Sequence, residues 1–206
     1  TIQSLADVQK LPIITRQDVR EHREDMVTRD CDRHLLAPVT TSGSTGEPLG
    51  IYHDREMSEL SESAYILRQW GWAGYRFGDR YASLRGQIIR LVDRNGKIRM
   101  WDYNTLNNQL VLLAQDTSLD TLTRAAQLLQ VFKPRFLYTY PSTLEILARY
   151  LQAQAIDNIR VEATFAESET LYPHQRTLIE AQFGGKVFGG YGHSERTVDA
   201  VECDHH

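Results

Sequence analysis

Residues 136–191 read FLYTYPSTLEILARYLQAQAIDNIRVEATFAESETLYPHQRTLIEAQFGGKVFGGY. Short runs rich in aromatic and β-branched residues alternate here with longer stretches that repeat apolar residues at helical spacing. We expect strands at Phe136–Tyr140, Val161–Phe165 and Val187–Tyr191, and helices at Ser142–Ala155 and Pro173–Phe183. Two successive strand–helix–strand units predict a mostly parallel sheet with flanking helices, which places the chain in the α/β class.

The ends of these two helices carry sequence signals of their own. Ser142 and Glu145 have the spacing of a capping box, and Pro173 suits the first turn of a helix. Gly184 and Gly185 follow the second helix, where glycine commonly ends one. The first helix is also amphipathic, with an apolar face made of Leu144, Leu147 and Leu151.

The chain before residue 136 predicts three more helices and, besides the strands that flank residues 40–49, three more strands. Thr15, with Asp18 three positions later, marks the start of a helix that runs to about Met26. Asp54 can cap a helix whose apolar stripe is Met57, Leu60, Ala64 and Leu67. The third helix, Ser118–Phe132, ends before Pro134 and has Leu119, Leu122, Ala126, Leu129 and Phe132 on one face. The strands are expected at Arg80–Leu84, Ile98–Tyr103 and Leu110–Leu113.

Residues 40–49, which read TTSGSTGEPL, form a second informative run. Both flanks read as strands, so the run is expected at the tip of a hairpin. Glycines let backbone N–H groups approach a ligand and the hydroxyls add donors, which together suit a grip on a polyphosphate. A simple turn is the alternative interpretation. The run is not a Walker A loop, because Glu47-Pro48 follow Gly46 where that motif requires lysine.

Polar residues also follow two of the expected parallel strands. Ser168-Glu169 come just after one strand, and Tyr191 through Glu195 come at the end of the next. Ligands of parallel sheets bind outside the carboxyl ends of the strands. Their placement therefore predicts that both segments contribute to one shared site.

Composition excludes several classes of protein. The chain has 206 residues and a formal net charge of −4, which argues against a nucleic-acid-binding protein. No apolar run is long enough to cross a membrane, and no secretory signal is recognisable. Cys31 and Cys203 form no disulfide framework, so we expect a cytoplasmic protein.

The ordered set of motifs resembles the adenylate-forming enzymes, which include acyl-CoA synthetases. The Gly-rich run is followed by the Glu167-Ser168-Glu169-Thr170 segment and then by Gly190-Tyr191-Gly192-His193-Ser194-Glu195. The branch most resembled is the phenylacetate-CoA ligase and capsular-polysaccharide-biosynthesis group. Its further motifs match Leu11–Arg20, Tyr140-Pro141-Ser142 and Ile179–Gly184, so the resemblance covers nearly the whole chain.

The resemblance implies the N-terminal part of a large AMP-binding domain. We expect residues 1–206 to be a partial domain, without the end of the N-terminal domain and without the C-terminal lid domain that carries a catalytic lysine. The implied reaction is ATP-dependent adenylation of a carboxylic acid, followed by acyl transfer, usually to CoA. We therefore expect residues 1–206 alone to have negligible ligase activity.

The resemblance also assigns roles to individual residues. ATP phosphates would be wrapped by the loop, and Tyr191 would stack on adenine beside the backbone of Ser168, Glu169, Thr170 and Gly192. Ser194 would reach the α-phosphate and Glu195 would hold Mg²⁺, a cation that prefers oxygen ligands. Thr45, Ser194 and Glu195 are the expected catalytic residues. The loop residues concerned are Thr41, Ser42, Gly43, Ser44, Thr45 and Gly46.

Several alternatives stay open. The chain can instead be a nucleotide-binding module without chemistry, a capsule-related transferase with an acceptor other than CoA, or an interaction protein that shares only the fold. A homodimer is compatible with the sequence. The acyl pocket is expected among aromatic residues and a proline, namely Tyr138, Tyr140, Pro141, Trp70 and Trp72. Cys203 and His206 can form half of a zinc site, although a free cysteine and a histidine-rich end are the simpler interpretation.

Overall fold

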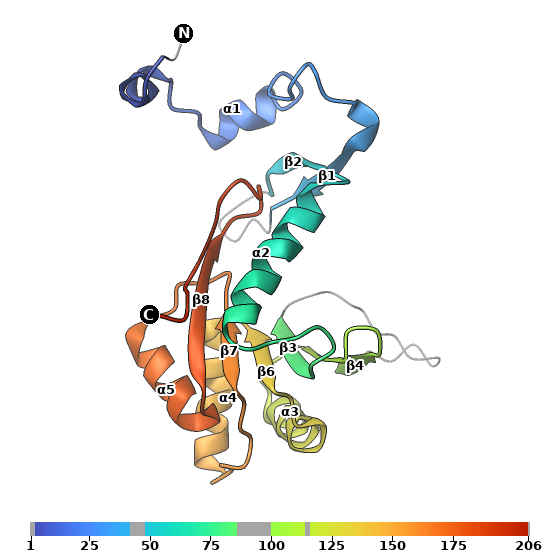
Figure 1. Ribbon diagram of the computed structural model, residues 1–206, viewed down its shortest axis with the longest axis vertical. Coiled ribbons are helices and arrows are strands. Elements are labelled where there is room, and N and C mark those ends of the chain that lie inside the picture. The colour runs from blue at the N-terminus through green and yellow to red at the C-terminus, as the bar shows by residue number, and fades with distance from the viewer. Residues whose placement is uncertain (1–2, 42–47, 86–99, 114–115, 206) are drawn as a thin grey trace. The chain divides into compact units, whose positions relative to one another are not determined.

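The structure is a computed structural model that describes residues 3–41, 48–85, 100–113 and 116–205. The chain divides into two compact units. The hairpin unit comprises residues 1–62 and 194–197, and the sheet unit comprises residues 63–193 and 198–206. Each unit is described by itself, with the colours of Figure 1 following the chain from blue to red.

The hairpin unit contains short helical segments and one antiparallel hairpin (Figure 1). The strands β1 (Leu36–Thr40) and β2 (Gly50–Asp54) pair so that Thr40 lies opposite Gly50. This confirms the hairpin expected around the Gly-rich run. Before the hairpin come the 3₁₀ helix η1, the α-helix α1 and the 3₁₀ helix η2, which are Leu5–Lys10, Arg16–Glu21 and Arg33–Leu35.

Helix α1 confirms its predicted start but not its predicted length. The side chain of Thr15 accepts the backbone N–H of Asp18, and Asp18 Oδ2 accepts the backbone N–H of Thr15 at 2.7 Å, which is the expected capping box. The helix ends at Glu21 rather than near Met26. It buries no residue, and a helix without a packed apolar face is only marginally stable.

Among the described residues, seven strands of the sheet unit form one sheet in the order β4-β5-β3-β6-β7-β8-β9. The five central strands are parallel, whereas the edge strands β4 and β9 run antiparallel to their neighbours. The sheet is therefore mostly parallel, as expected. The strands are β3 Tyr81–Arg85, β4 Trp101–Asn104, β5 Gln109–Leu113, β6 Phe136–Thr139, β7 Ala163–Ala166, β8 Lys186–Gly192 and β9 Asp199–Val201.

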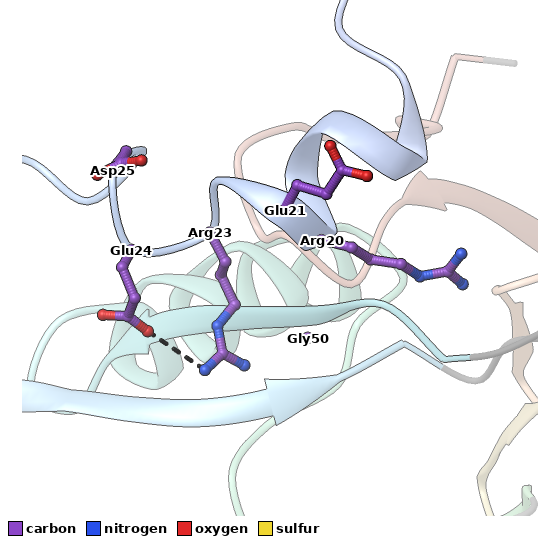
Figure 2. Close-up of a pocket in the computed structure, with 6 residues that line it drawn as sticks. All are labelled: Arg20, Glu21, Arg23, Glu24, Asp25 and Gly50. Atoms are coloured by element: carbon purple, nitrogen blue, oxygen red, sulfur yellow. Dashed lines mark hydrogen bonds and ion pairs between the residues drawn. The ribbon is translucent and has the colours of Figure 1, made fainter.

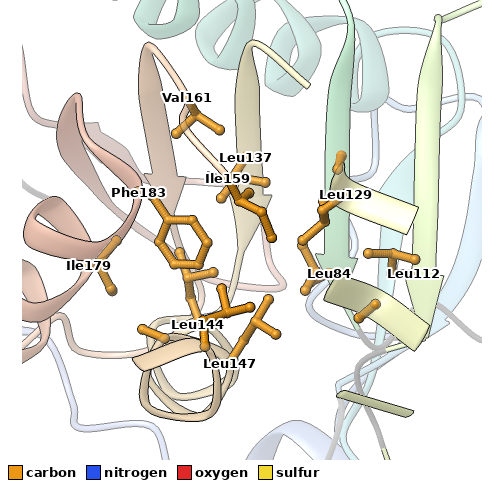
Figure 3. Close-up of a cluster of buried hydrophobic side chains, with 14 of the residues drawn as sticks. Leu84, Leu112, Leu129, Leu137, Leu144, Leu147, Ile159, Val161, Ile179 and Phe183 are labelled. Carbon is orange, nitrogen blue, oxygen red and sulfur yellow. The ribbon is translucent and has the colours of Figure 1, made fainter. Parts of the chain in front are cut away.

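Three helices cover one face of the sheet: α3 (Leu119–Phe132), α4 (Pro141–Ala153) and α5 (Pro173–Phe183). Their apolar side chains pack against alternate strand residues in one buried cluster, part of which is drawn in Figure 3. Phe183 and Ile179 enter it from α5, Leu144 and Leu147 from α4, and Leu129 from α3. The predicted bounds of α5 are confirmed, because its Pro173 start and its Gly184 end are both observed.

The opposite face carries a second, aromatic cluster. Helix α2 (Ser58–Trp72) supplies Trp70 from its last turns, and its indole stacks on Phe165 of β7 with ring centroids 4.6 Å apart. The predicted apolar stripe of this helix is not its buried face, since Met57, Leu60 and Leu67 are 62%, 66% and 46% exposed. The buried positions Gln69 and Trp70 lie at the end of the helix, where it meets the sheet.

The capping box predicted for α4 is wrong. The helix begins at Pro141, one residue before Ser142, and the N–H of Ser142 donates to Glu169 Oε2 at 3.1 Å. Glu145 instead binds Arg149 and Gln175. A carboxylate from the next strand end thus replaces the local cap, and a negative charge at a helix N-terminus is favourable.

Candidate functional site

Hydrogen bonds at the end of the hairpin join the two residues that flank the Gly-rich loop, Thr41 and Leu49. Beyond the last strand pair, the N–H of Thr41 donates to the carbonyl of Leu49 at 3.0 Å. The N–H of Leu49 in turn donates to Thr41 Oγ1 at 3.1 Å. Thr41 therefore holds the two ends of the loop together with both its backbone and its hydroxyl. The other predicted loop ligands, Ser42, Gly43, Ser44, Thr45 and Gly46, lie outside the described residues.

The segment that carries Ser194 and Glu195 belongs to the hairpin unit. The carbonyl oxygen of Ser194 lies 2.6 Å from Nε2 of His53, which is on β2. Arg196 is in the left-handed region at φ 55° and reaches the start of α2, where it donates to Ser58 Oγ at 3.2 Å and pairs with Glu62 at 2.7 Å. The structure thus anchors a turn with an exposed hydroxyl and an exposed carboxylate to the strand that leaves the Gly-rich loop.

His53 and Arg196 were not predicted as site residues. His53 sits in an ordinary strand pattern, and Arg196 follows the motif by one residue without a recognised signal. Both hold the Ser194–Glu195 turn through contacts that span more than 130 residues of sequence. Only the fold could reveal such contacts.

In the sheet unit, the predicted residues Ser168, Glu169 and Thr170 follow the carboxyl end of β7. Ser168 has a left-handed backbone, with φ 68°, and its Oγ accepts a hydrogen bond from Nη2 of Arg85 at 2.6 Å. Glu169 caps α4 through the N–H of Ser142. A non-glycine residue in this region of backbone conformation is uncommon and often marks a functional turn.

Tyr191 and Gly192 end β8 at the same edge of the sheet. Tyr191 pairs with Ala200 and Gly192 with Asp199 across the β8–β9 ladder. The side chain of Tyr191 is not packed in the core, because the residue is 66% exposed. Its ring therefore has an accessible face, and the backbone around it is fixed by an edge strand that the sequence did not predict.

Two ionisable groups that sequence reasoning missed lie beside these residues. Arg85, at the end of β3, places its guanidinium 4.2 Å from the ring centroid of Tyr138. Glu167, at the end of β7, accepts the hydroxyl of Tyr138 at 3.0 Å and pairs with Arg85 at 3.5 Å. Burial raises the pKa of Glu167, although Arg85 and the Tyr138 hydroxyl act in the opposite direction.

The residues expected to line an acyl pocket fall into three settings. Trp70 is 4% exposed and belongs to the aromatic core, and Pro141 is buried at the start of α4. Trp72 is 39% exposed, with the Arg68 guanidinium 5.1 Å from its ring. Tyr138 and Tyr140 are half-buried and both face Arg85. The two tyrosines are thus the members of this set that the structure brings to the strand ends.

A separate pocket of about 250 Å³ lies in the hairpin unit, between α1 and β2 (Figure 2). Charged residues line it, and Figure 2 shows the Arg23 guanidinium directed toward Glu24, at 3.2 Å. The guanidinium also lies over the ring of Tyr52 on β2, 4.8 Å from its centroid. The lining residues are Arg20, Glu21, Arg23, Glu24, Asp25 and Gly50.

The zinc half-site predicted at Cys203 and His206 is not tested by the structure. Within residues 3–41, 48–85, 100–113 and 116–205, no group of three or more His, Cys, Asp or Glu side chains is arranged to hold a metal ion. Cys203 is exposed, and His206 lies outside the described residues. In the same part of the chain, every helix is too short or too polar to span a membrane.

Comparison with known proteins gives one curated relative and many structural neighbours. No protein-family model matches the chain. Protein CapK of Staphylococcus aureus is 29% identical over 195 residues, which amount to 93% of this chain and 42% of CapK. The chain therefore spans less than half the length of this curated relative.

The structural neighbours include CoA ligases. An open conformation of 2-hydroxyisobutyryl-CoA ligase, in complex with 2-HIB-AMP and CoA, matches 97% of this chain and 45% of the ligase, with a TM-score of 0.66 and 18% identity. ATP-bound MatB from Rhodopseudomonas palustris matches 85% of this chain and 33% of MatB, with a TM-score of 0.56 and 17% identity. The anthranilate CoA ligase AuaEII, in complex with anthranoyl-AMP, matches 82% of this chain and 32% of AuaEII, with a TM-score of 0.56 and 18% identity.

Proposed function

From the fold that this chain shares with adenylate-forming CoA ligases, we propose that it belongs to an ATP-dependent ligase that adenylates a carboxylic acid and transfers the acyl group to CoA. The similarity to CapK and the motifs that resemble phenylacetate-CoA ligases support this family. A cytoplasmic location and Mg²⁺-bound ATP as the co-substrate are part of the proposal.

The observation that carries the proposal is the anchoring of the Ser194–Glu195 turn to the loop-bearing hairpin. His53 on β2 contacts the carbonyl of Ser194. Thr41 and Leu49, which flank the Gly-rich loop, are hydrogen-bonded to each other. The hairpin unit thereby joins two segments that are about 150 residues apart in the sequence and that offer hydroxyls, glycine amides and a carboxylate. Such donors suit the phosphates of ATP, and Glu195 would hold Mg²⁺ together with them.

Within the sheet unit, residues at the carboxyl ends of β7 and β8 are suited to bind a purine base. Tyr191 has an exposed ring on which a purine base can stack, and Gly192 lets the backbone approach it closely. Ser168, Glu169 and Thr170 lie at the carboxyl end of a neighbouring strand, which is where ligands of parallel sheets bind. These residues are proposed to line the adenine.

The proposed chemistry is largely positioning and charge stabilisation. A substrate carboxylate attacks the α-phosphate of ATP, pyrophosphate leaves, and an acyl-adenylate forms. Thr45 and Ser194 would donate hydrogen bonds to phosphate oxygens, on which negative charge builds as the bond to pyrophosphate breaks. Mg²⁺ would supply further positive charge to the same oxygens. Residues 1–206 alone are proposed to be inactive, because the family's catalytic lysine lies in the lid domain.

Transfer to an acceptor other than CoA is the alternative function. In that alternative the same adenylate forms, but the acyl or adenylyl group passes to an acceptor other than CoA. A nucleotide-binding module without chemistry is the remaining candidate. It would bind ATP through the same residues and release no pyrophosphate.

Calorimetric titration of ATP with Mg²⁺ tests the nucleotide site. We expect saturable binding that Tyr191→Ala and Thr45→Ala each weaken at least about tenfold, because stacking and phosphate hydrogen bonds are lost. Tyr65→Ala and Thr105→Ala are matched controls, since both residues are exposed and lie outside the proposed site. If residues 1–206 do not bind ATP, the titration is repeated on the natural full-length protein. Absence of binding there, or equal effects of the site and control variants, would refute the assignment.

A further inference from the structure

The sheet face that carries the aromatic cluster changes character toward the carboxyl ends of its strands. Side chains alternate between faces along a strand, so residues two positions apart share a face. In the β3–β6–β7–β8 register, Ser83, Tyr138, Phe165 and Phe188 form one row on this face. The next row toward the carboxyl ends is Arg85, Tyr140, Glu167 and Gly190. An aromatic floor is thus followed by a charged row at the edge where ligands bind.

Arg85 is held in place on three sides. Its guanidinium lies 4.2 Å from the Tyr138 ring centroid and 5.2 Å from that of Tyr140, and it donates to Ser168 Oγ at 2.6 Å. A guanidinium attracted by aromatic faces and fixed by a hydrogen bond has little rotamer freedom. Only 17% of its side chain is exposed. Arg85 therefore presents a fixed positive charge to Glu167.

Among the described residues, one carboxylate oxygen of Glu167 has interaction partners and the other has no hydrogen-bond partner. Oε2 accepts from the Tyr138 hydroxyl and pairs with Arg85. Oε1 is buried and has no hydrogen-bond partner among the residues that the structure describes. An acceptor buried without a partner costs free energy, and native proteins retain few such atoms without a functional reason.

Gly190 makes room for the Glu167 side chain. A Cβ built on Gly190 would lie 2.8 Å from Cγ of Glu167 and 3.2 Å from its Oε1. Any other residue at this position would crowd the carboxylate. The absence of a side chain at Gly190 therefore lets the Glu167 carboxylate lie against β8.

We propose that the row of Arg85, Tyr140, Glu167 and Gly190 binds the side chain of the substrate acid, and that this acid carries a hydroxyl or amino group that donates to Oε1 of Glu167. The inference rests on the proposed ligase function and narrows its substrate class. An acid whose corresponding group is a methyl would leave Oε1 without a donor. A site that hydrogen-bonds a substrate hydroxyl rejects the analogue that lacks it far more strongly than an apolar pocket rejects an extra hydroxyl.

Acid-dependent exchange of pyrophosphate into ATP by the natural full-length protein tests the inference. The substrates are matched in size: 4-hydroxyphenylacetate and 4-aminophenylacetate against 4-methylphenylacetate, and 2-hydroxyisobutyrate against pivalate. We expect kcat/KM to favour the hydroxyl- or amino-bearing acid of at least one set by about tenfold or more. Equal kcat/KM within every set would overturn the inference and leave the ligase function standing.

Variants show whether Glu167 is responsible. Glu167→Leu should abolish the preference, with the loss falling on the polar acid. This variant leaves the largely buried Arg85 without its ion-pair partner, which destabilises the fold. The Arg85→Leu/Glu167→Leu double variant, which removes both charges, is therefore tested beside it. The control is Glu162→Gln, at the opposite end of the same strand, where Glu162 pairs with Arg135 at 2.6 Å. A preference that survives in the double variant, or disappears in the control, would contradict the role of Glu167.

A binding measurement separates this inference from the proposed function. The same acids are titrated without ATP into isotope-labelled protein, and the side-chain resonances of Glu167 and Tyr138 are followed by NMR. Shifts caused by the polar acids and absent with their methyl counterparts support the acid site, even if no exchange activity is found. If neither acid of any set shifts these resonances and no acid supports exchange, both proposals fail.

Discussion

The two units of this chain are stabilised by different means. The sheet unit buries two clusters of apolar side chains, one on each face of its sheet. In the described part of the hairpin unit, Leu49 is the one buried hydrophobic residue. The difference indicates that the sheet unit carries most of the folding free energy, since apolar burial is the dominant favourable term in folding.

The hairpin unit relies on polar contacts near its surface. Glu24 pairs with Arg33 at 2.9 Å, Arg23 donates to the Tyr52 hydroxyl at 3.1 Å, and that hydroxyl also binds Glu24. The charged side chains are 40–63% exposed, and ion pairs in such settings contribute little to stability. Segments that bind ligands are commonly drawn from the less stable parts of a protein. Phosphate binding by the less extensively packed hairpin unit would fit that pattern.

The largest expected effect lies in the core of the sheet unit. Phe183→Ala removes a ring that is 0% exposed and should lower the free energy of unfolding by about 3–5 kcal/mol. Urea denaturation followed by tryptophan fluorescence measures this unit, because Trp70, Trp72 and Trp101 all belong to it. Phe77→Ala is the control, as Phe77 is 81% exposed. A loss below about 1 kcal/mol for Phe183→Ala would contradict the assignment of the core.

Two glycines, one from each unit, provide the next comparison. A Cβ on Gly185, which has φ 69°, would lie 2.2 Å from the backbone oxygen of Glu162. Gly185→Ala should therefore cost at least about 2 kcal/mol. In the hairpin unit, a Cβ on Gly50 would meet the flexible end of Arg23 at 2.7 Å. Gly50→Ala should change stability by no more than about 0.5 kcal/mol, because Arg23 can move aside.

Urea denaturation followed by tryptophan fluorescence measures the stability of the Gly185→Ala variant. Hydrogen exchange of the β2 amides measures the stability of the Gly50→Ala variant. Gly74→Ala shows the cost of backbone strain without a steric clash, because Gly74 has φ 88° and nothing within 4 Å of its Cβ position. It should cost about 1 kcal/mol. Equal losses at Gly185 and Gly50 would mean that the hairpin is packed as rigidly as the sheet.

The smallest effect concerns the pH dependence of stability. The pKa of Glu167 is raised above the ordinary glutamate value of 4.5, mainly because the carboxyl group is buried. Asp199 also raises this pKa, whereas Arg85 and the Tyr138 hydroxyl lower it. Between 4.5 and the raised pKa, the native state binds more protons than the unfolded chain, so the free energy of unfolding falls as pH rises. Glu167→Gln should remove this fall, whose slope is at most about 1.4 kcal/mol per pH unit.

The measurement compares urea unfolding of the wild type and of Glu167→Gln between pH 4 and 8. Glu162→Gln is the control with the opposite sign. Arg135 lowers the pKa of Glu162, so this residue contributes stability that is lost as pH falls below 4.5. A wild-type curve that parallels the Glu167→Gln curve would show that the pKa of Glu167 is not raised.

Much of the fold was predictable because it depends on local patterns. The Pro173 start and Gly184 end of α5, the capping box of α1 and the hairpin around the Gly-rich run were all predicted correctly. The buried face of α2 was not, because its most regular apolar stripe remains exposed and its last turn packs on the sheet instead. Edge strand β9 was also missed, since three residues give too little pattern.

The sequence by itself determined the class of fold, the order of the motifs and the residue types available to a nucleotide site, because periodicity, caps and turns act between near neighbours. Only the tertiary structure decided which distant residues meet. It placed His53 against the Ser194 carbonyl, Glu169 at the start of α4 and Arg85 beside Glu167. These partners are set by strand register and by the packing of helices on the sheet, which join residues that no local pattern relates.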